Sequence, residues 1–394
     1  THILRSQTEM PMTSKLNSRS LLTTVLLVWT LVHQVSLGAE PYPASRWHAY
    51  GNDSGGTRHS LATQITRDNI NKLKPAWTYR TGEDYTGKKQ AGRATFQATP
   101  LLIDGVLYLS TPSNRVIALN ATTGEELWAF DPDIDTESGL YAEFTSRGVS
   151  YWRDPVSGEQ RLFMGTIDGR LFALDMSTGK RVRSFGDDGE ISLTDGVGTV
   201  EPGMYSVTSP PAVVNDTVII GSAIGDNRRV RSEYGIVRAF DARSGVLRWS
   251  WDPIPRSVTD PVRSTWAGNS ADISGGGNAW PPLSVDAELG LVYVPTSAPS
   301  PDFYGGHRGG DNLYSNAVVA LDANSGRVVW HQQLVHHDVW DYDTPAQPVL
   351  VDIDLGAGSV PALIQVGKTG MMYVFDRRNG KPLIPIEERA VPTS

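Results

Sequence analysis

Short apolar runs alternate with polar turns along most of this sequence, and one such pattern recurs. Five segments read as an apolar run, an Asp or Asn, a tight polar turn closed by glycine, and a second run with alternating apolar positions. They are residues 116–132, 171–186, 237–253, 318–334 and 372–388. The pattern predicts β-hairpins, because glycine readily adopts the positive φ that a tight turn requires. The chain is therefore built on an internal repeat.

Each repeat has a further pair of predicted strands upstream, as in residues 99–111 and 209–223. Four short strands per repeat predict an all-β fold, a β-propeller of four-stranded blades. In three of the repeats Trp128, Trp249 and Trp330 stand four residues after the turn glycine, where a large flat ring can dock between neighbouring sheets. With a further strand expected near residues 73–83, the sequence predicts five to six blades.

Composition agrees with this fold and limits the partners. The chain has 394 residues, of which 39 are Gly, 25 are Pro and 11 are Trp, as in a turn-rich β protein. The formal net charge is -8 and no dense cluster of Lys and Arg is present, which argues against a nucleic-acid partner. The sequence has no cysteine, so disulfides, thiolate ligands and covalently attached haem are excluded for this chain.

The N-terminal region has the pattern of an export signal. Two basic residues precede the apolar run 21–32, and small residues follow at Gly38 and Ala39. The run is shorter than the roughly 20 residues that a membrane-spanning helix needs. It predicts a signal peptide with upstream residues over 1–39 and an incomplete propeller domain over 40–394. The expected location is the periplasm, free or associated with the membrane.

The segments that interrupt the repeat carry most of the chemically versatile residues, as is usual for loops on a rigid scaffold. Residues 335–348, "VHHDVWDYDTPAQP", place two histidines and three aspartates between apolar runs. His336 and His337 are adjacent, so on a strand they would point to opposite faces and not chelate one zinc ion. The stretch 274–278, "SGGGN", lacks the Lys-Ser/Thr of a phosphate loop and favours close approach of the backbone to a cofactor.

Several blocks of sequence resemble the quinoprotein dehydrogenases, which bind pyrroloquinoline quinone (PQQ). The blocks are "RGVSYW" (147–152), "YSVTSPP" (205–211), "GIVRAFDARSG" (235–245), "VHHDVWDYDTPAQP" (335–348) and "GKTGMMYVFDRRNG" (367–380). The chain is most similar to the branch of membrane glucose, polyol and quinate dehydrogenases. This resemblance implies an eight-bladed propeller with PQQ lying flat over the funnel end of its axis and a divalent metal, usually calcium, at the carbonyl edge of the quinone.

The resemblance also implies roles for individual residues. Asp341 falls at the catalytic base, and Lys368 at the cation beside the reactive quinone oxygens. The other implied cofactor contacts are Gln97, Arg147, Thr208, Asn278 and Trp280, and the implied metal ligands are Asp226, Asn227 and Asp341.

These residue types suit the oxidation of an alcohol. A carboxylate at Asp341 can take the hydroxyl proton, and the ammonium of Lys368 can stabilise negative charge on the reduced ring. Ligands that offer only oxygen favour a hard cation, with calcium as the first choice. Asp343 resembles the extra aspartate of lanthanide-using relatives, so the identity of the metal stays open and another hard divalent or trivalent cation is the alternative to calcium. An aspartate in a loop can also simply cap a turn, which is the alternative for Asp341 and Asp343.

Some positions depart from the family pattern. Gln97 replaces a glutamate that is common there, and Trp152 replaces a histidine of the glucose enzymes, which argues against glucose as the substrate. Ala298 stands where the methanol-oxidising branch has a metal-binding asparagine.

The expected function is PQQ-dependent oxidation of a sugar, polyol or cyclic alcohol, with ubiquinone or a separate cytochrome as electron acceptor. The alternative is a non-catalytic propeller scaffold or an inactive fragment of a quinoprotein, because five to six blades fall short of eight. An open ring leaves sheet faces unpaired, so we expect the chain alone to be poorly stable and to bind quinone weakly. A scaffold has no need of Asp341, Lys368 and Arg147 in matching blocks, which favours the enzyme.

Overall fold

The structure, a computed structural model, is an assembly of short β-strands. It describes residues 46–390 apart from 87, 89–91, 138–140 and 357. The predicted signal peptide, 1–39, lies outside the described residues. Among these residues the helical elements are α2 (Ser270–Ile273) and two 3-10 turns at Ile70–Lys72 and Pro261–Thr265. None of the helices in the described ranges has the length and hydropathy to cross a bilayer.

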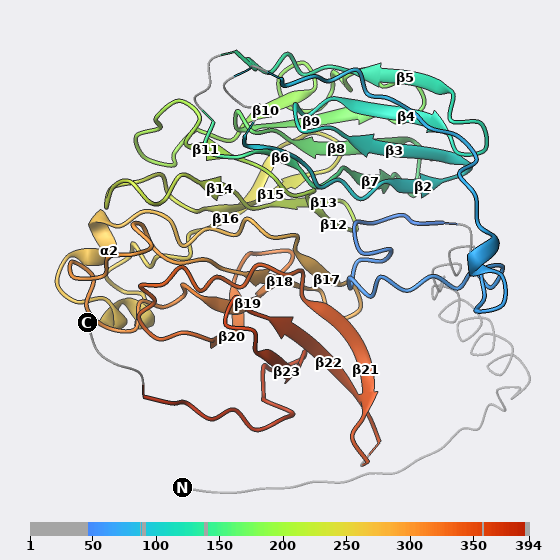
Figure 1. The fold of residues 1–394 in the computed structure, drawn as a ribbon. Coiled ribbons are helices and arrows are strands. Elements are labelled where there is room, and N and C mark those ends of the chain that lie inside the picture. The colour runs from blue at the N-terminus through green and yellow to red at the C-terminus, as the bar shows by residue number, and fades with distance from the viewer. Residues whose placement is uncertain (1–45, 87, 89–91, 138–140, 357, 391–394) are drawn as a thin grey trace, which may run out of the picture. The chain divides into compact units, whose positions relative to one another are not determined.

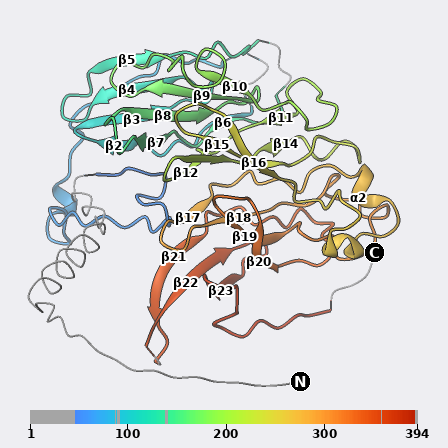
Figure 2. The same ribbon diagram turned by 180° about the vertical axis from the view of Figure 1, so that it is seen from behind.

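The strands form a succession of small antiparallel sheets. The first two contain β2 (Leu101–Ile103), β3 (Val106–Ser110), β4 (Val116–Asn120) and β5 (Glu126–Phe130), then β7 (Ser150–Arg153), β8 (Gln160–Gly165), β9 (Arg170–Asp175) and β10 (Glu190–Ser192). The next two contain β12 (Ala212–Val214), β13 (Thr217–Ile220), β15 (Val237–Asp241) and β16 (Leu247–Trp251), then β17 (Ser284–Asp286), β18 (Leu291–Pro295), β19 (Ala317–Asp322) and β20 (Val328–Gln333). The fifth contains β21 (Val349–Asp354), β22 (Ser359–Val366) and β23 (Met372–Asp376). Figures 1 and 2 show these sheets following one another in chain order, as propeller blades do, which confirms the predicted fold class.

Tryptophans join neighbouring blades, as the repeat predicts. The indole of Trp128 lies against the turn glycine Gly179 of the next blade, and its Nε1 donates to the carbonyl oxygen of Met176 at 3.2 Å. The same contact recurs between Trp77 and Gly124, Trp249 and Gly326, and Trp330 and Gly380. The ring leaves no room for a Cβ on these glycines, so the turn residue serves both the hairpin and the contact between blades.

The second repeat differs from its predicted hairpin. The chain turns through residues 182–189 after Gly179, so the fourth strand of this blade is β10 and not the segment that directly follows the glycine. The fourth position after Gly179 is Arg183, not Trp, and a turn closes the blade contact instead. The amide of Gly186 donates to the carbonyl oxygen of Ser244, next to the turn glycine Gly245, at 3.0 Å.

Two other predicted strands are absent from the described part of the chain. Residues 381–390 form no fourth strand in the last sheet, only an isolated bridge between Phe375 and Pro382. Pro382 and Pro385 have no amide hydrogen to donate to a ladder, which explains the interruption. Residues 73–83 also form no ladder, although Trp77 docks like the blade tryptophans.

Two pairs of very short strands lie outside the blades and carry four predicted site residues. β1 (Ala94–Phe96) pairs in parallel with β6 (Phe144–Ser146), and β11 (Tyr205–Ser206) pairs antiparallel with β14 (Ala223–Ile224). Gln97 and Arg147 directly follow β1 and β6, while Thr208 and Asp226 follow β11 and β14 by two residues. These accessory pairs therefore fix where the site loops leave the scaffold.

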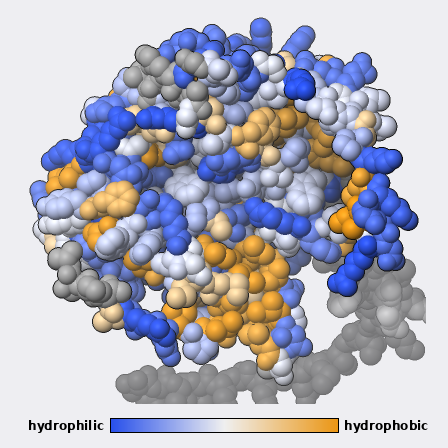
Figure 3. All heavy atoms as spheres, viewed as in Figure 1, coloured by the Kyte–Doolittle hydropathy of each residue, from blue (hydrophilic) through white to orange (hydrophobic). Residues whose placement is uncertain are grey.

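Hydrophobic side chains fill the space between adjacent blades. One cluster combines Ile219 and Val237 of the third sheet with Val292 and Val319 of the fourth, all fully buried. The fifth sheet is different, because Val366, Met371 and Met372 near its edge are 43%, 59% and 63% exposed. Figure 3 shows apolar side chains gathered over this sheet. The apolar side chains of this sheet are therefore partly exposed.

Candidate active site

Lys368 joins the two aspartates of the "DYD" stretch. Its Nζ lies 2.6 Å from Oδ1 of Asp341 and 2.9 Å from Oδ2 of Asp343. Lys368 stands in the turn between β22 and β23, whereas both aspartates stand in the loop between β20 and β21. The amide of Lys368 also donates to the carbonyl oxygen of Asp343 at 3.0 Å, so backbone and side chain together fix the contact. The predicted base and the predicted cation are therefore brought together.

Asp338, not Asp341, caps the turn of this loop. Its Oδ1 accepts from the amide of Trp340 at 2.9 Å, and its Oδ2 accepts from the amide of Tyr342 at 2.7 Å. Asp341 between them adopts a positive φ of 58° and turns its carboxylate to Lys368. A non-glycine residue in this conformation costs free energy that the surrounding contacts must offset. The turn-capping role considered for Asp341 thus belongs to its neighbour Asp338.

Asp343 is buried and holds the indole of Trp280 as well as Lys368. Its Oδ2 accepts from Nε1 of Trp280 at 3.1 Å, and its Oδ1 accepts from the amide of Ala298 at 3.0 Å. The guanidinium of Arg147 lies over the Trp280 ring, 5.0 Å from the ring centre. Asp343 therefore connects the loop of the predicted base to the flat ring predicted to contact the cofactor.

Arg147 and Thr208 are also in direct contact. Nη1 of Arg147 donates to the hydroxyl oxygen of Thr208 at 2.6 Å, and the amide of Arg147 donates to the carbonyl oxygen of Thr208 at 2.8 Å. Burial is the main influence on the guanidinium and lowers the pKa of Arg147. The predicted cofactor contacts Arg147, Thr208 and Trp280 thus form one connected group.

A second carboxyl pair lies in the same acidic region. The carboxyl groups of Asp226 and Asp302 are hydrogen-bonded to each other, and the charges of Asp341 and Asp343 act on both. Asp302 is 3% exposed. Burial, followed by the charge of Asp343, raises the pKa of Asp226 to about 7, and burial, followed by the charge of Asp226, raises the pKa of Asp302 to about 9.

The pKa values of the Lys368 bridge have mixed causes. Burial raises the pKa of Asp343 to about 6, although the ammonium of Lys368 opposes this shift. Burial acts to lower the pKa of Lys368, but the hydrogen bond to Asp341 and the charge of Asp343 outweigh it and raise the pKa. The ammonium form is therefore the form that the site stabilises.

Three predicted site residues lie apart from this group. Asn227 is exposed, and its side chain makes no hydrogen bond with the described residues. Asn278 is buried and already bonded, since its Nδ2 donates to the carbonyl oxygen of Ser222 at 2.7 Å and its Oδ1 accepts from Ser297 at 3.0 Å. Gln97 is exposed and donates to its neighbour Thr95 at 2.9 Å.

The structure also places the other residues that the sequence singled out. The ring of Trp152 is buried between blades, and its Nε1 donates to the carbonyl oxygen of Asn215 at 2.9 Å, so its contacts include none of the predicted site residues. The glycine stretch serves the packing of loops, because Gly276 leaves no room for a Cβ beside the amide of Ser300. His336 and His337 bond separately, to Glu388 at 2.7 Å and to the carbonyl oxygen of Gly310 at 2.9 Å.

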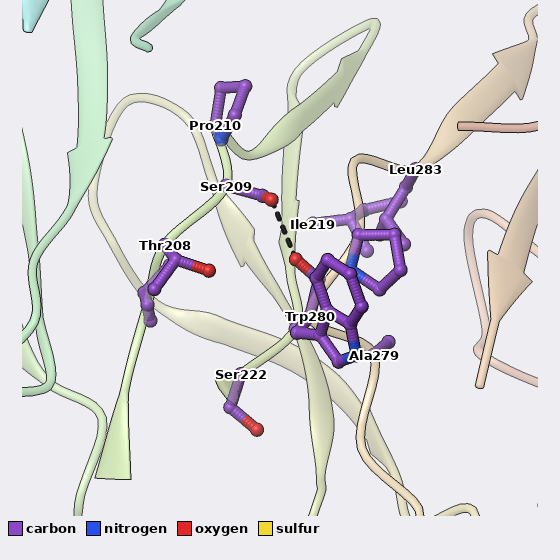
Figure 4. Close-up of a pocket in the computed structure, with 11 residues that line it drawn as sticks. Thr208, Ser209, Pro210, Ile219, Ser222, Ala279, Trp280 and Leu283 are labelled. Carbon is purple, nitrogen blue, oxygen red and sulfur yellow. Dashed lines mark hydrogen bonds between the residues drawn. The ribbon is translucent and has the colours of Figure 1, made fainter. Parts of the chain in front are cut away.

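A small pocket adjoins the site between the third and fourth blades. Thr208, Ser209 and Ser222 line one side, and Trp280 lines the other. Figure 4 shows the Thr208 hydroxyl turned toward Trp280, and Ser209 donating to the carbonyl oxygen of Trp280 at 2.6 Å. The hydrogen bond from Ser209 fixes the backbone of Trp280, while the Trp280 ring lies beside Arg147.

The residues present fit the groups that the resemblance implies. Asp226, Asp302, Asp341 and Asp343 offer only oxygen, the donor of hard cations, and Oδ1 of Asp302 is buried without a hydrogen-bond partner in the described part of the chain. The flat ring of Trp280 under the Arg147 guanidinium suits a planar anionic cofactor. Within residues that the structure describes, no three acidic or histidine side chains are already grouped as metal ligands. Lys368 instead neutralises Asp341.

The fold and this site define a β-propeller of the quinoprotein type. The family model for PQQ, the β-propeller domain of glucose, ethanol and alcohol dehydrogenases, matches residues 47–394, and the chain belongs to this family.

Named relatives agree with this assignment. The chain is 36% identical to quinoprotein glucose dehydrogenase of Escherichia coli over 89% of this chain and 45% of that protein. It is 38% identical to the glycerol dehydrogenase large subunit of Gluconobacter thailandicus over 88% of this chain and 47% of that protein. The crystal structure of quinohemoprotein alcohol dehydrogenase from Comamonas testosteroni superposes with a TM-score of 0.73 at 30% identity, over 87% of this chain and 50% of that chain. The chain thus spans about half the length of the relatives it matches.

Sequence reasoning missed two residues of this region. Asp302 was not singled out, although it stands four residues after Ala298, the position that was compared with a metal-binding asparagine. Asp338 is the turn cap, and the spacing Asp-x-Trp-Asp could have indicated an Asx turn before Asp341.

Proposed function

We propose that this chain carries the cofactor face of a PQQ-dependent dehydrogenase that oxidises the CH–OH group of a sugar, polyol or cyclic alcohol. The observation that supports it most is the bridge of Lys368 between Asp341 and Asp343, at 2.6 and 2.9 Å. The bridge places the carboxyl group of Asp341, a potential base, beside an ammonium that can stabilise an anion. Alcohol oxidation requires both functions at one place.

In this proposal Asp341 accepts the hydroxyl proton of the substrate. Its side chain is 29% exposed, so a substrate can reach it from the solvent. Asp343 is fully engaged with Trp280, Ala298 and Lys368, so it keeps the ammonium in place when Asp341 turns to the substrate. The two aspartates then have separate tasks, with Asp341 as base and Asp343 as positioning residue.

Trp280, Arg147 and Thr208 would hold the cofactor. Trp280 offers a flat surface, and Arg147 adds a positive charge beside it. Bound PQQ would supply the acceptor for two electrons, and a hard cation on the aspartates would polarise it. The residues that would hold this cation are Asp226 and Asp341, with calcium as the first choice.

The substrate class follows from two exposed rings and from the relatives. Trp340 and Tyr342 flank Asp341 and are 67% and 39% exposed. Aromatic rings beside a base can pack against the apolar face of a sugar or cyclic polyol. Relatives named for glucose and glycerol support the same class without choosing between its members.

The proposal extends to the electron acceptor and the location. The proposed electron acceptor is ubiquinone or a separate cytochrome, and residues 1–394 themselves carry no cysteine that could hold a covalent haem. The signal pattern within residues 1–39 supports export to the periplasm, where fractionation of cells that express the gene can locate the protein.

Reconstitution tests the proposed function directly. The protein is incubated with PQQ and calcium, separated from free quinone, and examined for retained quinone absorbance. Dye reduction is then screened with glucose, quinate, glycerol and simple alcohols. Retained quinone with reduction by at least one polyol or sugar is the expected result. Absence of both would leave a non-catalytic propeller.

A further inference from the structure

The Asp226–Asp302 pair has a free oxygen in a buried place. The two carboxyl groups are hydrogen-bonded to each other, which requires one proton between them. Asp302 is 3% exposed, and its Oδ1 is buried without a partner in the described residues. A buried carboxyl oxygen with no donor is costly, because burial removes its water without replacing it.

Backbone contacts hold the two aspartates against each other. Ser300 Oγ lies 2.6 Å from the carbonyl oxygens of both Asp226 and Arg229. The amide of Ser300 donates to the carbonyl oxygen of Gly275 at 2.9 Å. The loop that carries Asp302 is thus fastened to the loop that carries Asp226, and the pair is a built feature.

Positive side chains near the pair are committed elsewhere. Lys368 bonds to Asp341 and Asp343. Arg308 is fully buried and feels the charge of Asp302, but its hydrogen bonds go to Oδ1 of Asn312 and the carbonyl oxygen of Asp338. Within the described ranges, no ion pair reaches Asp226 or Asp302, so no ammonium or guanidinium neutralises these two carboxyl groups directly.

From this geometry we infer that Asp302 is a ligand of a hard cation, which it binds together with Asp226. Two touching carboxyl groups with a vacant oxygen provide the donors that calcium and lanthanide ions prefer. The inference rests on the proposed function in one respect: the proposed function also assigns Asp226 to a bound cation. It adds a ligand from the loop in which Ala298 offers no side-chain oxygen.

The test measures cation binding with no quinone or substrate present. Calcium affinity is determined by calorimetry for the wild-type chain and for Asp302→Asn. The Asn amide can donate to Asp226 as the shared proton does, so the variant keeps the pair's internal hydrogen bond but loses one anionic oxygen. Calcium affinity should fall at least about tenfold. Asp311→Asn removes the same charge from an exposed site nearby and should leave the affinity unchanged.

Terbium luminescence counts the water molecules left on the bound ion. In the wild type the ion should lose a large part of its hydration shell, and in Asp302→Asn it should regain about one water. Equal affinity and equal hydration in the two proteins would overturn the inference.

Two further results keep the inference separate from the proposed function and from folding. If Asp302→Asn fails to fold, the wild-type hydration decides, because an ion that retains nearly all its water cannot have Asp302 as a ligand. Loss of quinone binding with intact calcium binding would contradict the proposed function and leave this inference standing.

Discussion

Two pairs of aspartates share one acidic region, yet they balance their charge in different ways. Asp341 and Asp343 face the ammonium of Lys368 at 2.6 and 2.9 Å. Asp226 and Asp302 face each other, and no ammonium or guanidinium forms an ion pair with them in the part of the chain that the structure describes.

The charge of the first pair is neutralised by a residue of the chain, whereas the charge of the second pair can be neutralised by a group that exchanges with the solvent. Lys368 belongs to the chain, and its hydrogen bond to Asp341 and the charge of Asp343 raise its pKa, so the pair always has an ammonium beside it. The proton on the other pair is exchangeable, and a cation can take its place. The first pair therefore suits acid–base work, and the second suits a bound ion.

The largest effect is expected from Asp341→Asn, which removes the proposed base and keeps the shape. In protein loaded with quinone and calcium, the rate of dye reduction should fall by about 10²–10⁴-fold, the usual contribution of general base catalysis. Steady-state kinetics with the best substrate measure the rate, and quinone absorbance confirms equal loading. Asp311→Asn is the matched control. A variant that keeps at least a third of the wild-type rate would remove Asp341 from the mechanism.

The pH dependence of stability should distinguish the two pairs. Because the pKa of Asp226 is raised to about 7 and that of Asp302 to about 9, the folded chain holds protons that the unfolded chain has released. This stability is complete below about pH 4 and is lost as the pH rises through 7 and 9.

Urea unfolding from pH 5 to 9 measures this dependence. In EDTA the unfolding free energy should fall by about 1–3 kcal/mol over this range, and calcium should cancel most of the decline. Asp302→Asn in EDTA should show a flatter profile. The same slope in EDTA and in calcium would mean that no cation replaces the proton.

The repeat could be predicted from sequence because its signals are local: turn glycines and the tryptophans that follow them lie a few residues apart. Asp341 and Lys368 were instead predicted from the resemblance of the "DYD" and "GKTG" blocks to the quinoprotein dehydrogenases. The docking partner of each tryptophan, the turn of the next blade, follows from the repeat itself.

The second pair could not be predicted in the same way. Asp226 and Asp302 are brought together only by packing between the loops after β14 and β18, and nothing local marks Asp302. Asn227, next to Asp226 in sequence, is exposed instead. The strand predicted after Gly380 is absent for a local reason, because Pro382 and Pro385 cannot donate to a ladder. The prediction followed the repeat pattern and gave these two prolines too little weight.

Lys368→Met should remove the permanent neutralisation. Asp341 and Asp343 then face each other without a cation, and the unfolding free energy should fall by about 1–2 kcal/mol. The loss is moderate because the Lys368 side chain is 33% exposed and water screens part of the repulsion. Calcium should restore more stability to this variant than to the wild type. Lys381→Met changes an exposed lysine that follows the same sheet and should do neither. A wild-type response to calcium in Lys368→Met would show that the pairs are electrostatically independent.

The smallest effect concerns the indole that connects the first pair to the proposed cofactor face. Trp280→Phe keeps a flat ring but removes the Nε1 donor from Asp343, a hydrogen bond of 3.1 Å. Trp249→Phe removes the same donor from a neutral acceptor, the carbonyl oxygen of Ala323 at 2.9 Å, at a contact between blades. Each change should lower the unfolding free energy by about 1 kcal/mol, measured in urea. Quinone affinity, measured by absorbance titration, should weaken several-fold in Trp280→Phe alone. Without the indole donor, Asp343 positions the Lys368 ammonium of the proposed cofactor face less rigidly. Equal quinone affinities in the two variants would show that the Trp280–Asp343 bond contributes to stability and not to the site.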